Sequence, residues 1–179
     1  AEAQMGRYYG VPPYGAGGCT NAKICDAQCG YEKMVTTLLS YYAGINLAVE
    51  VSLDNHSLFA AEDLIVQNEI AGIVLRTGRA FEINDETLAF DLIKKVGIGG
   101  DFLAEKHTRT NIRRDFWYPP LTDRTSYETW LAKGAKDFRT RALERAKQLL
   151  AEHKPPPLDA DISKKLDEII GKAKKEAGL

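Results

Sequence analysis

Only two segments of this sequence have the character of β-strands, and both lie in its first third. VPPYGAG (11–17) gives a short extended stretch that runs into glycine, and INLAVEVSL (45–53) is apolar on nearly every residue. A helix-like segment separates them, which is the βα repeat of a parallel sheet with both faces buried. Because two parallel strands do not make a stable sheet alone, the sequence predicts that they belong to a larger one.

The rest of the sequence favours helices. The helical segments that we expect are 2–9, 26–43, 58–80, 85–96, a short helix around Trp130, 138–150 and 162–173. Asp26 and Asp85 are predicted to cap two of them, and Thr125 with Glu128 to form the capping box of the short helix. Gly44 and Gly97 are placed to end the helices that precede them.

Apolar residues at helical spacing predict which faces are buried. For the helix at 26–43 these residues are Tyr31, Met34, Val35, Leu38 and Tyr42. For the helix at 58–80 they are Val66, Ile70, Ile73 and Val74, and for the helix at 85–96 they are Leu88, Leu92, Ile93 and Val96. In the final segment the stripe is Ile162, Leu166, Ile169, Ile170 and Ala173.

The order of elements predicts an α/β fold that is mostly helical. A complete (β/α)8 barrel needs about 200 residues or more, and this chain has 179. We therefore expect residues 1–80 to be the terminal βα units of a TIM-type barrel and residues 81–179 to be a helical C-terminal extension. The chain opens on Ala1 within a helix-like segment, so we expect it to be a piece of a longer protein.

Composition excludes several classes of function. The formal net charge of −1 gives no basic excess for binding nucleic acid. No apolar run approaches the ~20 residues of a membrane span. Three cysteines cannot form a complete disulfide framework, which favours a reducing, cytoplasmic location.

Three segments resemble a known family. GAGGCTNAKICDAQCGYEK (15–33), KKVGIGGDFLAEKHTRTNIRRDFWYPPLTDRTSYETW (94–130) and LLAEHKPPPL (149–158) resemble the C-terminal third of the trimethylamine methyltransferase family. The family pattern D-x-Q-x-G-x-E falls on Asp26, Gln28, Gly30 and Glu32. The pattern G-x-G-x-x-F-L-x-x-x-H-T begins at Gly97, and the likeness covers essentially all of the chain.

The resemblance implies a (β/α)8 enzyme that moves a methyl group from trimethylamine or a related tertiary or quaternary amine to a corrinoid protein. The corrinoid (cobalamin) is then supplied by that partner, and no cofactor is bound tightly by this chain. In methanogens the family often carries pyrrolysine, which does not occur in this sequence. Because about six of the eight strands are absent, we expect residues 1–179 alone to be inactive. The alternative is a non-catalytic helical module that binds a corrinoid protein or another partner.

In a barrel the chemistry lies at the carboxyl ends of the strands, which selects the loops after the two predicted strands. Carboxylates there could hold a cationic amine. The substrate-binding candidates are therefore Asp26, Glu32, Glu50 and Asp54. The structural alternatives are an N-cap for Asp26 and a solvated first-turn acid for Glu32.

Gly17 and Gly18 are the candidates for cofactor contact. GAGGCT lacks the spacing of a dinucleotide or P-loop motif, although its backbone amides could cradle a phosphate. We expect its small residues to let the backbone approach the corrinoid or the substrate, and a simple tight turn is the alternative.

Cys19, Cys25 and Cys29 suggest zinc, but no C-x-x-C pair and no neighbouring histidine accompany them, so the sequence predicts no metal site. Buried small side chains are the default reading of these cysteines.

A basic and aromatic segment follows the predicted barrel units. It contains His107, Arg109, Arg113, Arg114, Phe116 and Trp117. We expect a structural role, in which Trp117 and Tyr118 anchor the helical extension and Arg113 or Arg114 pairs with acids. A contact surface for the corrinoid protein is the alternative. The apolar flanks of an incomplete barrel also predict a homo-oligomer.

Overall fold

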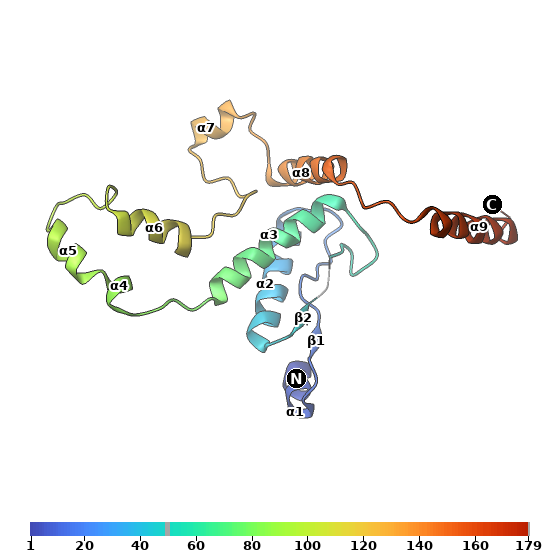
Figure 1. Ribbon diagram of the computed structural model, residues 1–179, viewed down its shortest axis with the longest axis horizontal. Coiled ribbons are helices and arrows are strands. Elements are labelled where there is room, and N and C mark those ends of the chain that lie inside the picture. Colours follow the sequence, from blue (N-terminus) through green and yellow to red (C-terminus); the bar gives the residue numbers. More distant parts are fainter. Residues whose placement is uncertain (49–50, 179) are drawn as a thin grey trace. The chain divides into compact units, whose positions relative to one another are not determined.

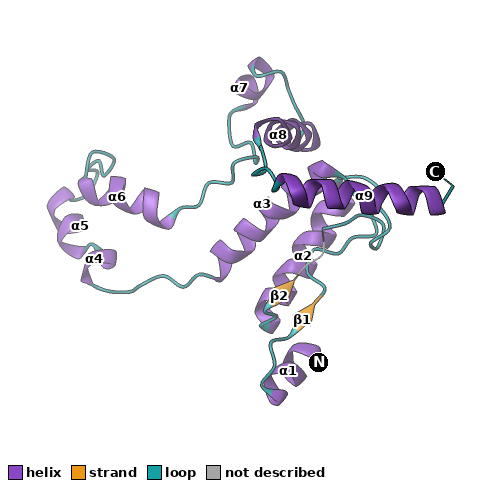
Figure 2. Cartoon of the chain, turned by 45° about the vertical axis from the view of Figure 1, so that its right-hand side comes forward, coloured by secondary structure: helices purple, strands orange, loops and turns teal. Residues whose placement is uncertain are grey.

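The computed structural model describes residues 1–48 and 51–178 (Figure 1). Strand β1 (Tyr14–Gly15) pairs in parallel with β2 (Leu47–Ala48), with Tyr14 opposite Leu47 and Gly15 opposite Ala48. Helix α2 (Ala27–Ala43) connects the two strands. This βαβ unit is visible in Figure 2, and it confirms the prediction of two short parallel strands in a chain that is mostly helix.

Both strands are shorter than predicted within the described part of the chain. After β1 the backbone leaves the extended conformation at Gly18, whose φ is 97°. After β2, Leu53 forms an antiparallel bridge with Leu58, so residues 53–58 make a tight turn in place of further strand. Among the described residues each strand has a single hydrogen-bonded neighbour, so no further pairing extends the strands.

The remaining helices follow the predicted order. They are α1 (Glu2–Tyr9), α3 (Ala61–Gly78), α4 (Asp85–Leu88), α5 (Phe90–Val96), α6 (Lys106–Asp115), α7 (Tyr127–Ala132), α8 (Phe138–Glu152) and α9 (Ala160–Glu176). None of these helices in the described residues is both long and apolar enough to cross a membrane.

The chain divides into two compact units, Ala1–Ala146 and Lys147–Leu179. The second unit contains the whole of α9, whose predicted apolar stripe is exposed at Ile162, Leu166, Ile169 and Ile170. The predicted division of the chain into residues 1–80 and 81–179 stays a prediction.

Local signals located most helix ends correctly. The Asp26 side chain accepts the Cys29 N–H and caps α2, and Gly44 ends α2 with a φ of 75°. Gly97 ends α5. The predicted caps Asp85 and Thr125 were wrong by one residue. Asn84 and Ser126 cap instead, because the oxygen of each reaches the amide three residues further on.

The predicted helix at 85–96 is broken in two. Ala89 has a φ of 51°, which ends α4 and begins α5. The predicted inward face is wrong at Leu88 and Ile93, which are both exposed. The break at Ala89 interrupts the spacing on which that face was predicted.

The main core lies on α3. Val66, Ile70 and Val74 are buried together with Leu121 and Ala142, which confirms the predicted face of α3. On α2, Met34 and Leu38 pack against this core, but Tyr31, Val35 and Tyr42 are exposed, so that part of the predicted face was wrong. The buried residues of α2 are Cys29, Lys33 and Thr37.

The segment after α6 is anchored to α3, as expected for Trp117. A Cβ at Gly72 would lie 2.4 Å from the Trp117 ring, so the ring rests directly on the α3 backbone. The buried Glu69 carboxylate accepts the Leu121 and Thr122 N–H groups and the Thr122 hydroxyl. Arg114 pairs with Glu86 and Asp115, which confirms the expected pairing with acids.

Candidate functional site

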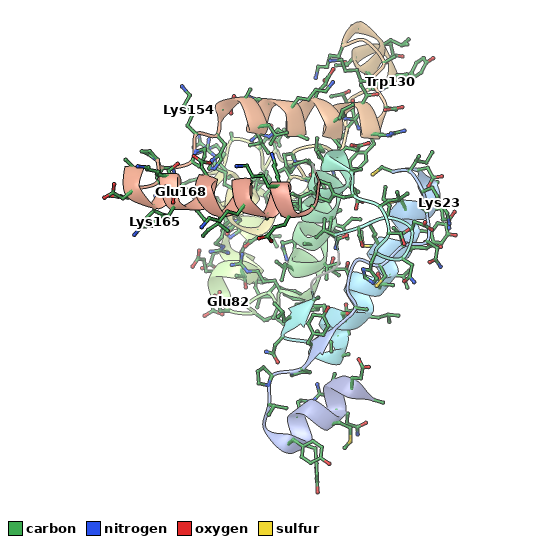
Figure 3. The ribbon with its side chains drawn as sticks, turned by 90° about the vertical axis from the view of Figure 1, so that its right-hand side faces the viewer. Lys23, Glu82, Trp130, Lys154, Lys165 and Glu168 are labelled. Carbon is green, nitrogen blue, oxygen red and sulfur yellow. The ribbon has the colours of Figure 1, made fainter. Side chains whose placement is uncertain are left out.

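The loops that follow β1 and β2 are joined to each other. The Asp54 N–H donates to the Ala22 carbonyl at 2.9 Å, and the Asn55 N–H donates to the Thr20 carbonyl at 3.0 Å. The Lys23 Nζ lies 2.9 Å from Asp54 Oδ1. Lys23 itself projects from the first of the two loops (Figure 3). The two loops therefore form one surface at the carboxyl ends of the paired strands.

The turn after β2 has a strained backbone. Asp54, Asn55 and His56 have φ values of 49°, 48° and 75°, which is the left-handed region that non-glycine residues rarely adopt. The backbone hydrogen bonds from Asp54 and Asn55 to the first loop hold this conformation. Strain of this kind concentrates at functional sites, so the turn is a candidate part of one.

Glu32 organises the loop after β1. Its Oε2 accepts the Thr20 hydroxyl at 2.7 Å and the Asn21 N–H at 2.8 Å, and its Oε1 accepts the Gln28 side-chain amide at 3.0 Å. These donors, the Thr20 hydroxyl first, hold the pKa of Glu32 below its usual range. The carboxylate is therefore ionised and fixed in position at neutral pH.

A shallow hollow opens beside Glu32. Its walls come from the first loop, α2 and the turn after β2, and consist of Cys19, Thr20, Asn21, Tyr31, Glu32, Val35, Thr36 and Asn55. One predicted substrate-binding residue, Glu32, lines this hollow. Asp54 adjoins it through its neighbour Asn55. The Tyr31 ring is exposed, so the hollow offers an aromatic face next to a carboxylate.

The other predicted substrate residues lie elsewhere or beyond the description. Asp26 caps α2 by accepting the Cys29 N–H at 3.1 Å, which is the structural alternative that the sequence offered for it. Glu50 lies outside the described residues. Substrate binding by Asp26, Glu32, Glu50 and Asp54 stays a prediction.

Gly17 and Gly18 lie where the chain leaves β1. A Cβ on Gly17 would come within 2.7 Å of Ala48 Cβ and 3.3 Å of Ser40, so glycine permits close contact with β2 and α2. The Gly18 N–H donates to the Thr36 hydroxyl at 3.1 Å. Both glycines thus have a structural use, and their contact with a corrinoid stays a prediction.

A buried charged cluster lies behind these loops. Lys33 Nζ is 3.0 Å from Asp63 Oδ2 and donates to the Ser52 carbonyl at 3.1 Å, and both side chains are essentially inaccessible to solvent. The Cys25 and Cys29 thiols lie 3.7 and 3.6 Å from Asp63 Oδ1. Hydrogen bonding with Cys29, followed by burial, raises the pKa of the Cys25 thiol, so it is neutral. The cluster links the first loop, α2, α3 and the turn after β2.

Sequence reasoning missed Lys33 and Asp63. A lysine in a helix is normally solvent-exposed, and Asp63 is 30 residues away from Lys33 in the chain. An available signal was the position of Lys33 four residues after Cys29 and four before Thr37, which places the three side chains on one face of α2.

Comparisons with known proteins identify relatives over the whole chain. The profile of the trimethylamine methyltransferase family matches residues 1–178. A glycine betaine methyltransferase of Desulfitobacterium hafniense is 41% identical over 99% of this chain. A trimethylamine methyltransferase of Methanosarcina barkeri is 39% identical over 98% of it. A trimethylamine methyltransferase of D. hafniense is 36% identical over 99% of it.

The chain is much shorter than these relatives. The matched regions make up 37%, 35% and 36% of the three relatives, respectively. The chain therefore spans little more than a third of the length of the curated proteins that it matches.

Proposed function

Because this chain belongs to the trimethylamine methyltransferase family, we propose that it is the C-terminal third of an enzyme that demethylates a tertiary or quaternary amine. The names of its relatives bracket the substrate class, since both trimethylamine and glycine betaine carry methyl groups on a nitrogen that can bear a positive charge. The methyl acceptor in this proposal is the reduced corrinoid of a partner protein.

The proposed reaction is a displacement at the methyl carbon. The C–N bond breaks and its electron pair stays on the nitrogen, which leaves as the amine with one methyl group fewer. The Co(I) of the corrinoid supplies the electron pair of the new Co–C bond and is oxidised to Co(III). Trimethylamine reacts as its protonated ammonium form, so no proton has to be removed by the protein. Residues of the site would position and desolvate the cation.

The proposed architecture is the end of a (β/α)8 barrel. The parallel β1–α2–β2 unit supports it, because a helical crossover between parallel strands is the repeating unit of such barrels. The joined loops after β1 and β2 supply part of the rim at the carboxyl ends of the strands. In this proposal, residues 81–179 form a helical extension after the barrel.

The observation that carries the proposed site is the fixed carboxylate of Glu32 beside the exposed ring of Tyr31. An ionised carboxylate and an aromatic face are the two groups that hold a methylated ammonium ion. Asp54 lies on the adjoining strained turn and pairs with Lys23 of the loop after β1. It adds a second carboxylate at the same rim. Glu50, two residues after the end of β2 in the sequence, stays a sequence-based candidate for substrate binding.

The test uses the whole protein with a reduced corrinoid protein and a panel of tertiary and quaternary amines. Loss of the Co(I) absorbance reports methyl transfer. We expect turnover with one member of the panel, and a tenfold or greater loss of kcat/KM in Glu32→Gln and Asp54→Asn, which corresponds to about 1.4 kcal/mol or more. Glu168→Gln, an exposed acid on α9 (Figure 3), is the matched control.

Two results would contradict the proposal. An enzyme that is inert with every amine of the panel would exclude the substrate class. Unchanged kcat/KM in both Glu32→Gln and Asp54→Asn would remove these carboxylates from the site while leaving the reaction itself intact.

A further inference from the structure

Two thiols and a carboxylate converge behind the candidate site. The ligand atoms of Cys25, Cys29 and Asp63 all lie within 4.8 Å of one another. They come from three segments: Cys25 from the loop after β1, Cys29 from the first turn of α2, and Asp63 from the first turn of α3. Cys29 and Asp63 are buried, whereas Cys25 is half-buried and gives access from solvent.

The spacing of these atoms fits a tetrahedral metal ion. With Zn–S distances of about 2.3 Å and Zn–O distances of about 2.1 Å, tetrahedral angles place a sulfur and an oxygen ligand about 3.6 Å apart. The Cys25 and Cys29 sulfurs lie 3.7 and 3.6 Å from Asp63 Oδ1. These two sulfur–oxygen distances would therefore need little change when a zinc ion binds.

The second oxygen of Asp63 has its own partner. In metal-bound carboxylates the oxygen that does not bind the metal is usually held by such a partner. Asp63 Oδ2 pairs with the buried Lys33 ammonium at 3.0 Å, and Lys33 also donates to the Ser52 carbonyl. Such contacts orient a ligating carboxylate and leave its first oxygen for the metal.

The charge of the cluster also permits a divalent ion. With two thiolates, the Asp63 carboxylate and the Lys33 ammonium around a divalent ion, and the two thiol protons released to solvent, the formal charges sum to zero. Binding therefore adds no uncompensated charge to a buried site.

We propose that Cys25, Cys29 and Asp63 bind one zinc ion, with a water molecule as the fourth ligand. Two sulfur ligands favour zinc over magnesium or calcium, which select oxygen ligands. The ion joins the loop after β1 to the first turns of α2 and α3, and so fixes the loop that carries Thr20 and Asn21. The sequence-based prediction was no metal site, and it considered no ligand from α3.

The test uses Co²⁺ as the probe with the chain of 179 residues, kept reduced by a phosphine and freed of metal by a chelator. We expect one equivalent of Co²⁺ to bind with tetrahedral d–d bands and the sulfur-to-cobalt absorption of two thiolate bonds. One equivalent of Zn²⁺ should then displace it, and elemental analysis should find one zinc per chain.

Variants separate the proposed ligands from the third cysteine. Cys25→Ser and Cys29→Ser should each halve the sulfur-to-cobalt absorption and weaken Zn²⁺ binding by at least tenfold. Cys19→Ser is the matched control and should keep the sulfur-to-cobalt absorption and the Zn²⁺ affinity of the unmodified chain. Circular dichroism of each metal-free variant confirms that the helices are retained.

The decisive arm is the unmodified chain, whose helices are checked by circular dichroism before metal is added. Absence of the sulfur-to-cobalt absorption at stoichiometric Co²⁺ overturns the proposal, as does octahedral binding without sulfur ligands. Equal loss in Cys19→Ser and Cys25→Ser also overturns it, because it would place the metal elsewhere.

Discussion

At the scale of single residues, the buried Lys33–Asp63 pair is the most consequential feature of the structure. An ion pair removed from water is sensitive to the loss of either partner, because the remaining charge has no compensation. This pair also holds the Ser52 carbonyl, so it connects the helices with the turn that carries Asp54.

Lys33→Met is expected to destabilise the metal-free chain by about 3–5 kcal/mol, since it leaves the Asp63 carboxylate buried and unpaired. The double variant Lys33→Met with Asp63→Leu should recover most of this loss. Urea unfolding in the presence of a chelator measures both. A single variant as stable as the parent would show that the pair is solvated in solution.

Gly17→Ala should destabilise the chain by about 1–3 kcal/mol, because the added methyl group would lie 2.7 Å from Ala48 Cβ. Gly30→Ala is the control: nothing lies within 4 Å of the added methyl group, and Gly30 is inside α2. Alanine there should stabilise by about 0.5–1 kcal/mol. Thermal unfolding of the two variants should move in opposite directions, and a shift in the same direction would contradict the observed packing.

The lowered pKa of Glu32 makes the free energy of unfolding depend on pH. Because its pKa is lowered in the folded chain, it stabilises the fold above the unfolded glutamate pKa of about 4.3. That contribution disappears as the pH falls through the lower folded pKa. Glu32→Gln should therefore be less stable than the parent at pH 7, with the difference shrinking towards pH 3. Urea unfolding across this range checks it, and a difference independent of pH would assign the loss to packing alone.

At the scale of elements, local chemistry made much of the fold predictable. Asp26 begins its helix, and Gly44 and Gly97 end theirs, as predicted, because capping depends on residues that are close in sequence. The face of α3 was predictable from its apolar spacing.

The failures have tertiary causes. The face of α2 was misjudged because Lys33 is buried by a partner on another helix, and aromatic Tyr31 and Tyr42 face solvent. The left-handed Ala89 broke a helix whose sequence carries no glycine or proline at that point. Of the candidate site, the loops and Glu32 followed from sequence, but the contacts between the two loops join residues more than 30 positions apart.

At the scale of the whole molecule, exposed apolar side chains predict self-association. Around the βαβ unit the exposed residues include Tyr14, Leu39 and Leu47, each more than half accessible. Tyr14 and Leu47 lie opposite each other in the paired strands, and large exposed apolar patches commonly form interfaces. We expect the chain of 179 residues to be a dimer or a higher oligomer, as measured by static light scattering. A monomer at high concentration would contradict this expectation.

We propose that this chain supplies part of an amine-demethylating site and that the rest of the proposed barrel is needed to complete it. Correct positioning of reactants can account for ~7–11 kcal/mol of a barrier, and two loops cannot enclose an amine against a corrinoid.

The most direct measurement compares methyl transfer to a reduced corrinoid protein by the whole protein and by residues 1–179 alone. The same amine, trimethylamine or glycine betaine, is supplied to both. We predict that the whole protein transfers the methyl group and that residues 1–179 give no detectable transfer. Turnover by residues 1–179 alone, or an inert whole protein, would contradict this proposal.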